Sequence, residues 1–436
     1  MKPSFRYLAG LFTALFLLAV PGQVSLAAPV ELSLDDSIAL ALKNNPEIKL
    51  ADSARKKSLW AVRQAAAGMG PNLAFTHTDK RYDSFNTTKL YLYGIKQYEW
   101  SNKYDNLLTL SLPLYSGGKL DGQLDAARLG FKVADLGVAA TRQQLTQTVT
   151  TYYFGVLQYR NSLQVSRQTV DNYVRHLKNV QLQFEAGVVA KSDVLASEVS
   201  LANAQVNLIK AQNSHVLAVA NLNNAIGLPL DSELALKEDL KYTEYAQTLD
   251  ECAKYALVNR PELAQYQAKV AIAGDDVKVA RSGYLPQVNF SATQDWYDAE
   301  FPGNDNKTWS VGVAASFNVF DSGLTRSKVR QAQEGLATAR EQAGQKRDAV
   351  LLEVRQYYLS MREAEKRIEA SQVGVNQAEE NLRIAELRYS AGVGTNLDVL
   401  DAVLSLNTAK LSNIQALYDY NTNKAQLNRA MGTPVK

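Results

Sequence analysis

Few residues of this 436-residue chain have the types and spacing that chemistry at an active site requires. Its three histidines, His77, His176 and His215, lack the spacing of metal ligands, so we expect them to be solvated or packed. The single cysteine, Cys252, cannot form a disulfide within the chain. The segment Ser116–Lys119 lacks the upstream glycine of a phosphate-binding loop, and no nucleophile, base and orienting residue form a recognisable set. The sequence therefore predicts no enzyme, no metal site and no cofactor.

Three aspartates are better placed for a functional role. Asp193 and Asp398 each follow a turn between two helical patterns, and Asp401 comes three residues after Asp398. Asp398 and Asp401 therefore lie along one face of a helix, where two carboxylates can attract a cation. An N-cap role at the start of the returning helix explains Asp193 equally well. For Asp398 we consider that role the less favoured interpretation, because of the second carboxylate.

The turn before Asp398 ends a very long helical pattern. From Leu324 to Ala391 the chain contains no proline, and at 1.5 Å per residue a helix of about 67 residues is roughly 100 Å long. Apolar residues recur there at steps of three and four, which predicts a heptad seam that packs on partner helices. This seam comprises Val354, Tyr358, Met361, Ala364, Ile368, Val375, Ala378, Leu382, Ala385 and Tyr389. Core packing alone would explain Tyr389.

The chain contains two copies of one unit. Ser33–Pro46 matches Thr248–Pro261, and Phe184–Leu195 matches Tyr389–Leu400. Each copy begins with a capping-box pattern, in which a hydroxyl and a carboxylate satisfy free amides at the start of a helix. The expected units are the first copy at 28–228, a polar connector at 229–247 and the second copy at 248–436.

Within each copy the apolar period changes from that of a helix to that of a strand. Apolar residues alternate with small or polar ones over 108–114 in the first copy and over 309–319 in the second. This alternation predicts strand hairpins with one apolar face and one small polar face. The expected elements are strand hairpins at about 72–115 and 287–320, long helices at about 119–185 and 324–390, and returning helices at about 192–226 and 397–431.

The faces of these hairpins favour a membrane. Aromatic residues flank the alternating strands, as a membrane interface favours, although such residues also occur in soluble sheets. They are Tyr91, Tyr93, Tyr98, Trp100, Trp296, Tyr297 and Trp309. Four strands alone would expose unpaired edges to lipid. Three chains would supply twelve strands, enough for a closed barrel with a lumen.

The first residues have the pattern of an export signal. Lys2 and Arg6 precede an apolar run over Leu8–Val20, and small residues follow at Ser25–Ala27. We expect a signal peptide at 1–27, because the run is too short to span a membrane comfortably. Without these two cations, 45 Lys and Arg residues remain against 44 Asp and Glu residues. A formal charge near zero predicts no nucleic-acid partner.

The order of these elements and the two turns, 186–195 and 391–400, resembles the TolC-like family of outer-membrane efflux proteins, the outer membrane factors. The resemblance covers essentially the whole mature chain. It implies an α+β membrane protein: a homotrimer with a twelve-stranded β-barrel in the outer membrane, joined to a long α-helical barrel in the periplasm. It also implies a periplasmic adaptor protein and an inner-membrane pump as partners, contact with outer-membrane lipid, export of small molecules or proteins, and no catalysis.

The same resemblance implies roles for residues at the tips of the long helices. Asp398 and Asp401 fall on the ring that lines the narrow aperture. In a member of the family, links among a tyrosine, an arginine and an aspartate of the other repeat form a latch that closes this tip. Tyr389 and Asp193 fall on the tyrosine and aspartate positions, but Gly394 falls on the arginine position, so we expect a looser or differently held tip. The expected adaptor contacts are Gly187, Val188, Gly392 and Val393.

Two simpler interpretations remain open. Gly187 and Gly392 are most simply helix C-terminal residues that permit a left-handed backbone. An exported coiled-coil scaffold without a channel would also explain the long helices. That scaffold would have no use for two hairpins whose faces suit lipid and water.

Overall fold

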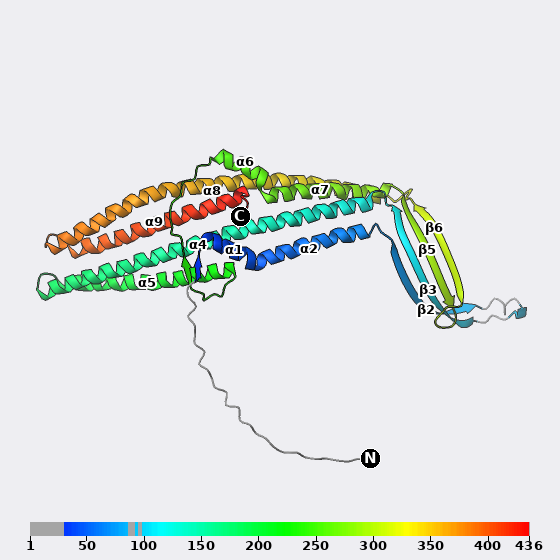
Figure 1. Cartoon of the computed structure of the whole chain (residues 1–436), viewed down its shortest axis with the longest axis horizontal. Helices are drawn as coiled ribbons and strands as arrows, with labels where there is room; N and C mark the ends of the chain where they lie inside the picture. Colours follow the sequence, from blue (N-terminus) through cyan, green and yellow to red (C-terminus); the bar gives the residue numbers. More distant parts are fainter. Residues whose placement is uncertain (1–29, 86–91, 95–97, 436) are drawn as a thin grey trace, which may run out of the picture.

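The computed structural model describes residues 30–85, 92–94 and 98–435. These residues form an elongated helical body with a sheet at one end (Figure 1). The expected signal segment 1–27, Tyr91 and the side chains of Tyr98 and Trp100 lie outside this description. No helix in the described ranges is both long and apolar enough to cross a membrane.

The elements occur twice in the same order. The first copy contains β1 (Val30–Leu32), α1 (Leu34–Asn44), α2 (Pro46–Ala67), β2 (Asn72–Phe85), β3 (Tyr98–Tyr115), α4 (Lys119–Glu185) and α5 (Lys191–Ile226). The connector contains β4 (Leu234–Leu236), which pairs in parallel with β1. The second copy contains α6 (Leu249–Asn259), α7 (Pro261–Arg281), the 3-10 turn η1 (Ser282–Tyr284), β5 (Gln287–Asp298), β6 (Asn306–Ser316), α8 (Leu324–Ser390) and α9 (Asn396–Met431).

Local sequence explains where the short helices begin. The side chains of Ser33 and Thr248 each accept a hydrogen bond from the backbone N–H three residues on. The carboxylates of Asp36 and Glu251 in turn accept a hydrogen bond from the backbone N–H of Ser33 and Thr248. Both capping boxes therefore satisfy amides that have no partner inside the helix. Pro46 begins α2, and Pro261 begins α7, because a first-turn residue needs no N–H donor.

The two long helices, α4 and α8, contain 67 residues each and run without interruption. Each folds back on its returning helix, so α4 pairs with α5 and α8 pairs with α9 (Figure 1). The predicted heptad seam of α8 is inside these contacts: Val354, Met361 and Ala364 are fully buried, and Leu382 and Tyr389 are buried nearer the tip. Apolar contact along the seam holds each hairpin together.

The sheet has the order β2-β3-β5-β6, and all its neighbouring strands are antiparallel. Directly opposed residues point to the same face, so one face carries rows such as Leu73, Leu110, Ala292 and Val311. The other face carries rows such as Ala74, Thr109, Thr293 and Ser310. The structure thus has one apolar face and one small polar face, as the alternation predicts.

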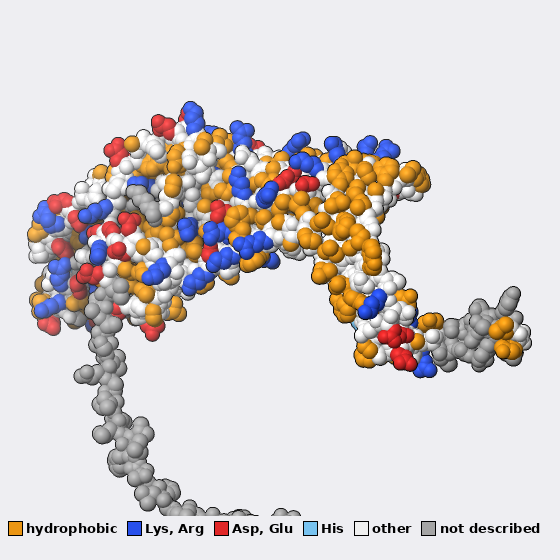
Figure 2. Space-filling model, turned by 45° about the vertical axis from the view of Figure 1, so that its right-hand side comes forward, with side chains coloured by type: hydrophobic (Ala, Val, Ile, Leu, Met, Phe, Trp, Pro, Cys, Tyr) orange, Lys and Arg blue, Asp and Glu red, His pale blue; other side chains and the backbone are white. Residues whose placement is uncertain are grey.

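The apolar face of the sheet is uncovered within this chain. Phe75, Trp309, Val311 and Val313 are all exposed, and hydrophobic side chains gather over the sheet and its junction with the helices (Figure 2). Within the described strands, β2 and β6 each have a neighbour on one side only. β6 ends at Ser316, a few residues before the expected end, because its partner β5 begins opposite that residue, just after Pro286.

Candidate functional site

The site lies at the tips of the two hairpins, where both turns have the same backbone. Gly187 and Gly392 each have a φ of 73°. The N–H of Val188 donates to the carbonyl of Gln183 over 2.9 Å, and the N–H of Val393 donates to that of Arg388 over 3.0 Å. These are the bonds of a glycine-terminated helix end, so the two glycines have a backbone role. Val188 and Val393 are exposed.

The returning helices begin differently after these similar turns. In α9, Thr395 Oγ1 accepts from the Asp398 N–H over 3.2 Å, and Asp398 Oδ2 accepts from the Thr395 N–H over 2.9 Å. In α5 the N-cap is Ala190, which makes no side-chain cap. Asp193 is the third residue of α5, so the N-cap interpretation of Asp193 is wrong. Asp398 does stabilise a helix start, as the second member of a capping box rather than as the N-cap.

The structure brings Asp398 and Asp401 together on an exposed face of α9. Both line a hollow of about 230 Å³ between α8 and α9, and Arg388 of α8 lines it too. The backbone hydrogen bond from Thr395 lowers the pKa of Asp398 most, the Thr395 hydroxyl adds to this, and the charge of Arg388 contributes. Asp398 therefore stays ionised, and two carboxylates face solvent on one side of the tip.

The two latch candidates, Tyr389 and Asp193, make no side-chain hydrogen bond to each other within the described part of the chain. Tyr389 is 6% exposed, and its hydroxyl has no hydrogen-bond partner in the described part of the chain. Burial raises the pKa of Tyr389, and the charge of Asp193 adds to this. At Gly394 a Cβ would lie 3.0 Å from the Tyr389 nitrogen and 3.1 Å from the Arg388 carbonyl carbon. Any side chain there, an arginine included, would require the turn to shift.

A buried polar cluster beside Tyr389 joins the two hairpins instead. The Nε2 of His176 on α4 lies 2.6 Å from Oδ1 of Asn396 on α9. The hydroxyl of Ser197 on α5 shares its one proton between this oxygen at 3.1 Å and the Asp193 carbonyl at 2.8 Å, and Asn396 Nδ2 donates to the same carbonyl over 3.0 Å. His176 is packed, which was one of the two expectations for it. Its partner was missed because the two residues are 220 positions apart and no local pattern links them.

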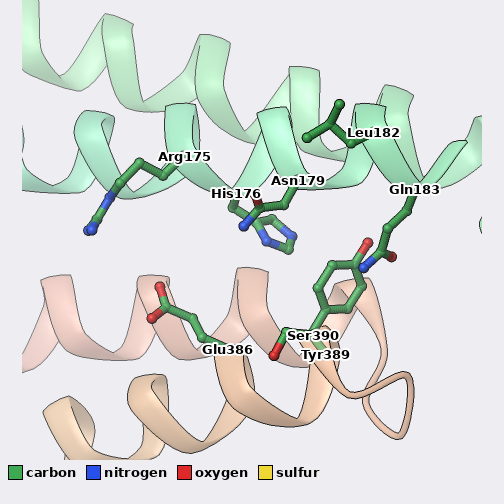
Figure 3. A pocket seen from close by; sticks show the side chains of 8 residues that line it. All are labelled: Arg175, His176, Asn179, Leu182, Gln183, Glu386, Tyr389 and Ser390. Atoms are coloured by element: carbon green, nitrogen blue, oxygen red, sulfur yellow. The ribbon is translucent and has the colours of Figure 1, made fainter. Parts of the chain in front are cut away.

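A cavity of about 410 Å³ lies next to this cluster, between α4 and α8, and Figure 3 shows the side chains that line it. It is lined by Arg175, His176, Asn179, Leu182, Gln183, Glu386, Tyr389 and Ser390. The rings of His176 and Tyr389 project toward each other into this space, with centroids 5.1 Å apart and planes at 62°. Burial lowers the pKa of His176, and its bond to Asn396 and the charge of Glu386 oppose this shift in part.

Elsewhere in the described ranges, the groups that could bind a metal or react do not form a site. No group of three or more metal-ligating side chains could hold a metal ion there. Cys252 is buried and free. Arg260, the largest fully buried side chain, is held by Glu262 at 2.8 Å and by Glu353 at 2.9 Å, where it joins α7 to α8. The tips are therefore the strongest candidate site.

Known proteins share both the sequence pattern and the architecture. Residues 37–228 and 253–433 match the family model described as "Outer membrane efflux protein". The chain is 24% identical over 407 residues to Outer membrane protein TolC of Escherichia coli, which covers 89% of this chain and 80% of that protein. It is 25% identical over 411 residues to Alkaline protease secretion protein AprF of Pseudomonas aeruginosa, which covers 91% and 83%.

Solved structures agree with the fold. The Campylobacter jejuni CmeC outer membrane channel superposes with a TM-score of 0.80 at 18% identity and covers 92% of this chain and 85% of its own. The outer membrane protein VceC from Vibrio cholerae superposes with a TM-score of 0.79 at 19% identity and covers 92% and 97%.

Proposed function

We infer that this chain, which belongs to the outer membrane efflux protein family, is the outer-membrane channel of an efflux or type I secretion system. The observation that carries this proposal is the sheet, with its apolar face, its small polar face and its unpaired edges. An apolar outer face suits lipid, and a small polar inner face suits a water-filled lumen. Edge strands in lipid must pair, so copies of the chain close the barrel together.

The helical body supports the same assembly through two uncovered apolar stripes. On α5 the stripe comprises the exposed residues Leu195, Val199, Val206, Ile209 and Val216. On α8 it comprises the exposed residues Leu352, Leu359, Val373, Ile384 and Leu387. Both follow heptad spacing, and α5 and α8 lie on opposite sides of the helical body (Figure 1). In the proposed assembly α5 of each copy contacts α8 of the next copy. Because this contact joins two different surfaces, it repeats in one direction around the assembly, and the copies close into a ring.

Three copies satisfy both requirements, so the proposed assembly is a homotrimer. Its twelve strands form a barrel with a lumen, and the helices form a tunnel in the periplasm. The exposed turns around Gly187, Val188, Gly392 and Val393 are the proposed contacts for a periplasmic adaptor, which links the channel to an inner-membrane pump. The protein is then exported, lies in the outer membrane in contact with lipid, and has no nucleic-acid partner.

Purification from detergent-extracted outer membranes tests this function. We expect light scattering to give a trimer and planar lipid bilayers to show a conducting pore. A coiled-coil scaffold would not partition with these membranes and would not conduct. A folded monomer in mild detergent, or a trimer that never conducts, would contradict the proposal.

We propose further that Asp398 and Asp401 form the selectivity ring of the aperture. Three chains would bring six carboxylates into one narrow opening, where like charges raise one another's pKa and attract cations. This effect opposes the lowering of the Asp398 pKa by Thr395 within one chain. The hydrogen bond to Thr395 also fixes the Asp398 side chain, so the carboxylate is held in place at the tip.

The double variant Asp398→Ala and Asp401→Ala tests the ring in planar bilayers. We expect weaker cation selectivity and weaker block by divalent ions, with the trimer intact. Asp193→Ala is the matched control, and it should alter the resting conductance only slightly. A double variant that conducts and blocks like the parent, but melts earlier, would leave these aspartates as helix-capping residues only.

A further inference from the structure

The buried cluster at the tips places one side chain of the second hairpin inside the first. His176, Ser197 and Asn396 are 5%, 1% and 6% exposed. Asn396 is the first residue of α9, yet its polar atoms bond to α4 and α5. The cluster therefore cannot survive a separation of the two hairpins.

The partners of Asn396 determine which nitrogen of His176 carries the proton. The amide nitrogen of Asn396 donates to the Asp193 carbonyl, which can only accept, so Oδ1 faces the imidazole. Nε2 of His176 must then be the donor. In the neutral ring Nδ1 is unprotonated, and a second proton there would place a charge on a buried group.

Each of the four helices of the tip carries charged or titratable groups near the cluster, and among them the charge of Glu386 acts on the imidazole. Arg175 precedes it on α4, and Glu386 and Tyr389 face it from α8 across the cavity (Figure 3). Asp193 of α5 acts electrostatically on Tyr389, and Asp401 of α9 acts on Tyr173, one turn before His176. The pKa of His176 is lowered, so the effect of burial outweighs the bond to Asn396 and the charge of Glu386, which both raise the pKa. The neutral ring is therefore the form that the closed cluster prefers.

We propose that the hydrogen bond between His176 and Asn396, supported by Ser197, is the latch that holds the channel tip closed. The proposal rests on the channel function inferred above. A side chain at Gly394 would require the observed turn to shift, and the Tyr389 hydroxyl makes no hydrogen bond within the described part of the chain. A neutral latch thus replaces a charged one. His176 and Asn396 act as positioning residues, since they hold the hairpins and touch no cargo.

This latch makes the closed tip sensitive to acid. Opening separates Asn396 from His176 and exposes the ring to water, where its pKa returns toward about 6.5. Above that pH both states hold a neutral ring and the closed tip keeps its full stability. As the pH falls from there through the lowered pKa of the closed state, the open state binds the proton better and gains population. Acid therefore favours opening.

The test uses the full chain in planar lipid bilayers at about pH 7.5 and about pH 5, on either side of the ordinary histidine pKa. The parent should conduct more at the lower pH. His176→Gln keeps a donor for Asn396 but cannot take up a proton, so it should match the parent at high pH and show no rise. His176→Phe removes the donor and should raise the resting conductance roughly fivefold to tenfold at high pH. His215→Gln on α5 is the matched control and should keep the parent's pH response.

Failure of the latch is distinguishable from failure of the channel. A parent that forms no pore contradicts the channel function itself. A conducting parent together with a His176→Phe variant of equal resting conductance would overturn the latch. So would a His176→Gln variant that keeps the full rise in acid. If His176→Phe does not assemble as a trimer by light scattering, the pH profile of His176→Gln decides alone.

Discussion

A single charge in the apolar stripe of α5 should break the trimer without unfolding the chain. Ile209 lies in the middle of this stripe and is 64% exposed in the isolated chain. Burying an aliphatic side chain completely is worth about 1.5–3 kcal/mol, so the part of Ile209 still exposed is worth about 1–2 kcal/mol in the assembly. Ile209→Glu forfeits this and also forces an unpaired carboxylate out of water, which costs further free energy.

The expected loss is therefore about 3 kcal/mol or more at each interface, which is more than a hundredfold in the association constant. Three equivalent interfaces multiply the effect. The fold of each chain should tolerate the change, because a substitution at an exposed position usually alters stability by about 0.5 kcal/mol or less. Light scattering in detergent over a dilution series measures the dissociation, and circular dichroism measures the helix content.

Gln212→Glu is the matched control, because it adds the same charge one turn along α5, at an exposed position outside the stripe. It should leave the trimer intact. If Ile209→Glu dissociates no more readily than Gln212→Glu, the α5 stripe does not contact a neighbouring copy. If Ile209→Glu loses its helix content together with its trimer, the stripe supports the fold of the chain rather than the assembly.

Two further substitutions test the sheet and the helical body. Val313→Lys places a cation on the apolar face and should destabilise the barrel in lipid vesicles by about 2–4 kcal/mol near the bilayer centre, measured by urea unfolding, whereas Ser310→Lys on the polar face should be tolerated. Arg260→Ala removes the buried partner of Glu353, which keeps its ion pair with Arg429 at 2.8 Å, and should destabilise the detergent-solubilised protein by about 1.5–3 kcal/mol. A smaller loss than for a typical surface substitution would show that this ion pair is dispensable.

The features that could be predicted from the sequence are those set by near neighbours. The capping box of Thr248 and Glu251 needs residues three apart, and the long helices follow from heptad spacing and the absence of proline. The two faces of the sheet follow from alternation. The bond between His176 and Asn396 could not be predicted, because only the folded hairpins bring these residues together. The N-cap interpretation of Asp193 failed because a cap depends on the backbone where the helix begins, which here is Ala190.

The two copies provide an internal comparison that separates residues needed for shape from residues needed for function. Both turns contain the same Gly-Val pair with the same glycine φ, so the backbone explains these residues. Asp401 is different, because the corresponding position after the first turn is Ala196. Since α5 begins well without a carboxylate there, helix geometry does not require Asp401.

Asp401→Ala is therefore the cleanest test of the proposed selectivity ring. Unlike Asp398, whose carboxylate accepts a bond from the Thr395 N–H, Asp401 takes no part in the cap of α9. The variant should keep the melting temperature of the parent and lose part of its preference for cations, measured as a shift in the reversal potential across a salt gradient. Removing three of six carboxylates weakens the field at the aperture without changing the turn. An unchanged reversal potential would place Asp401 away from the ion path, whatever its exposure at the tip.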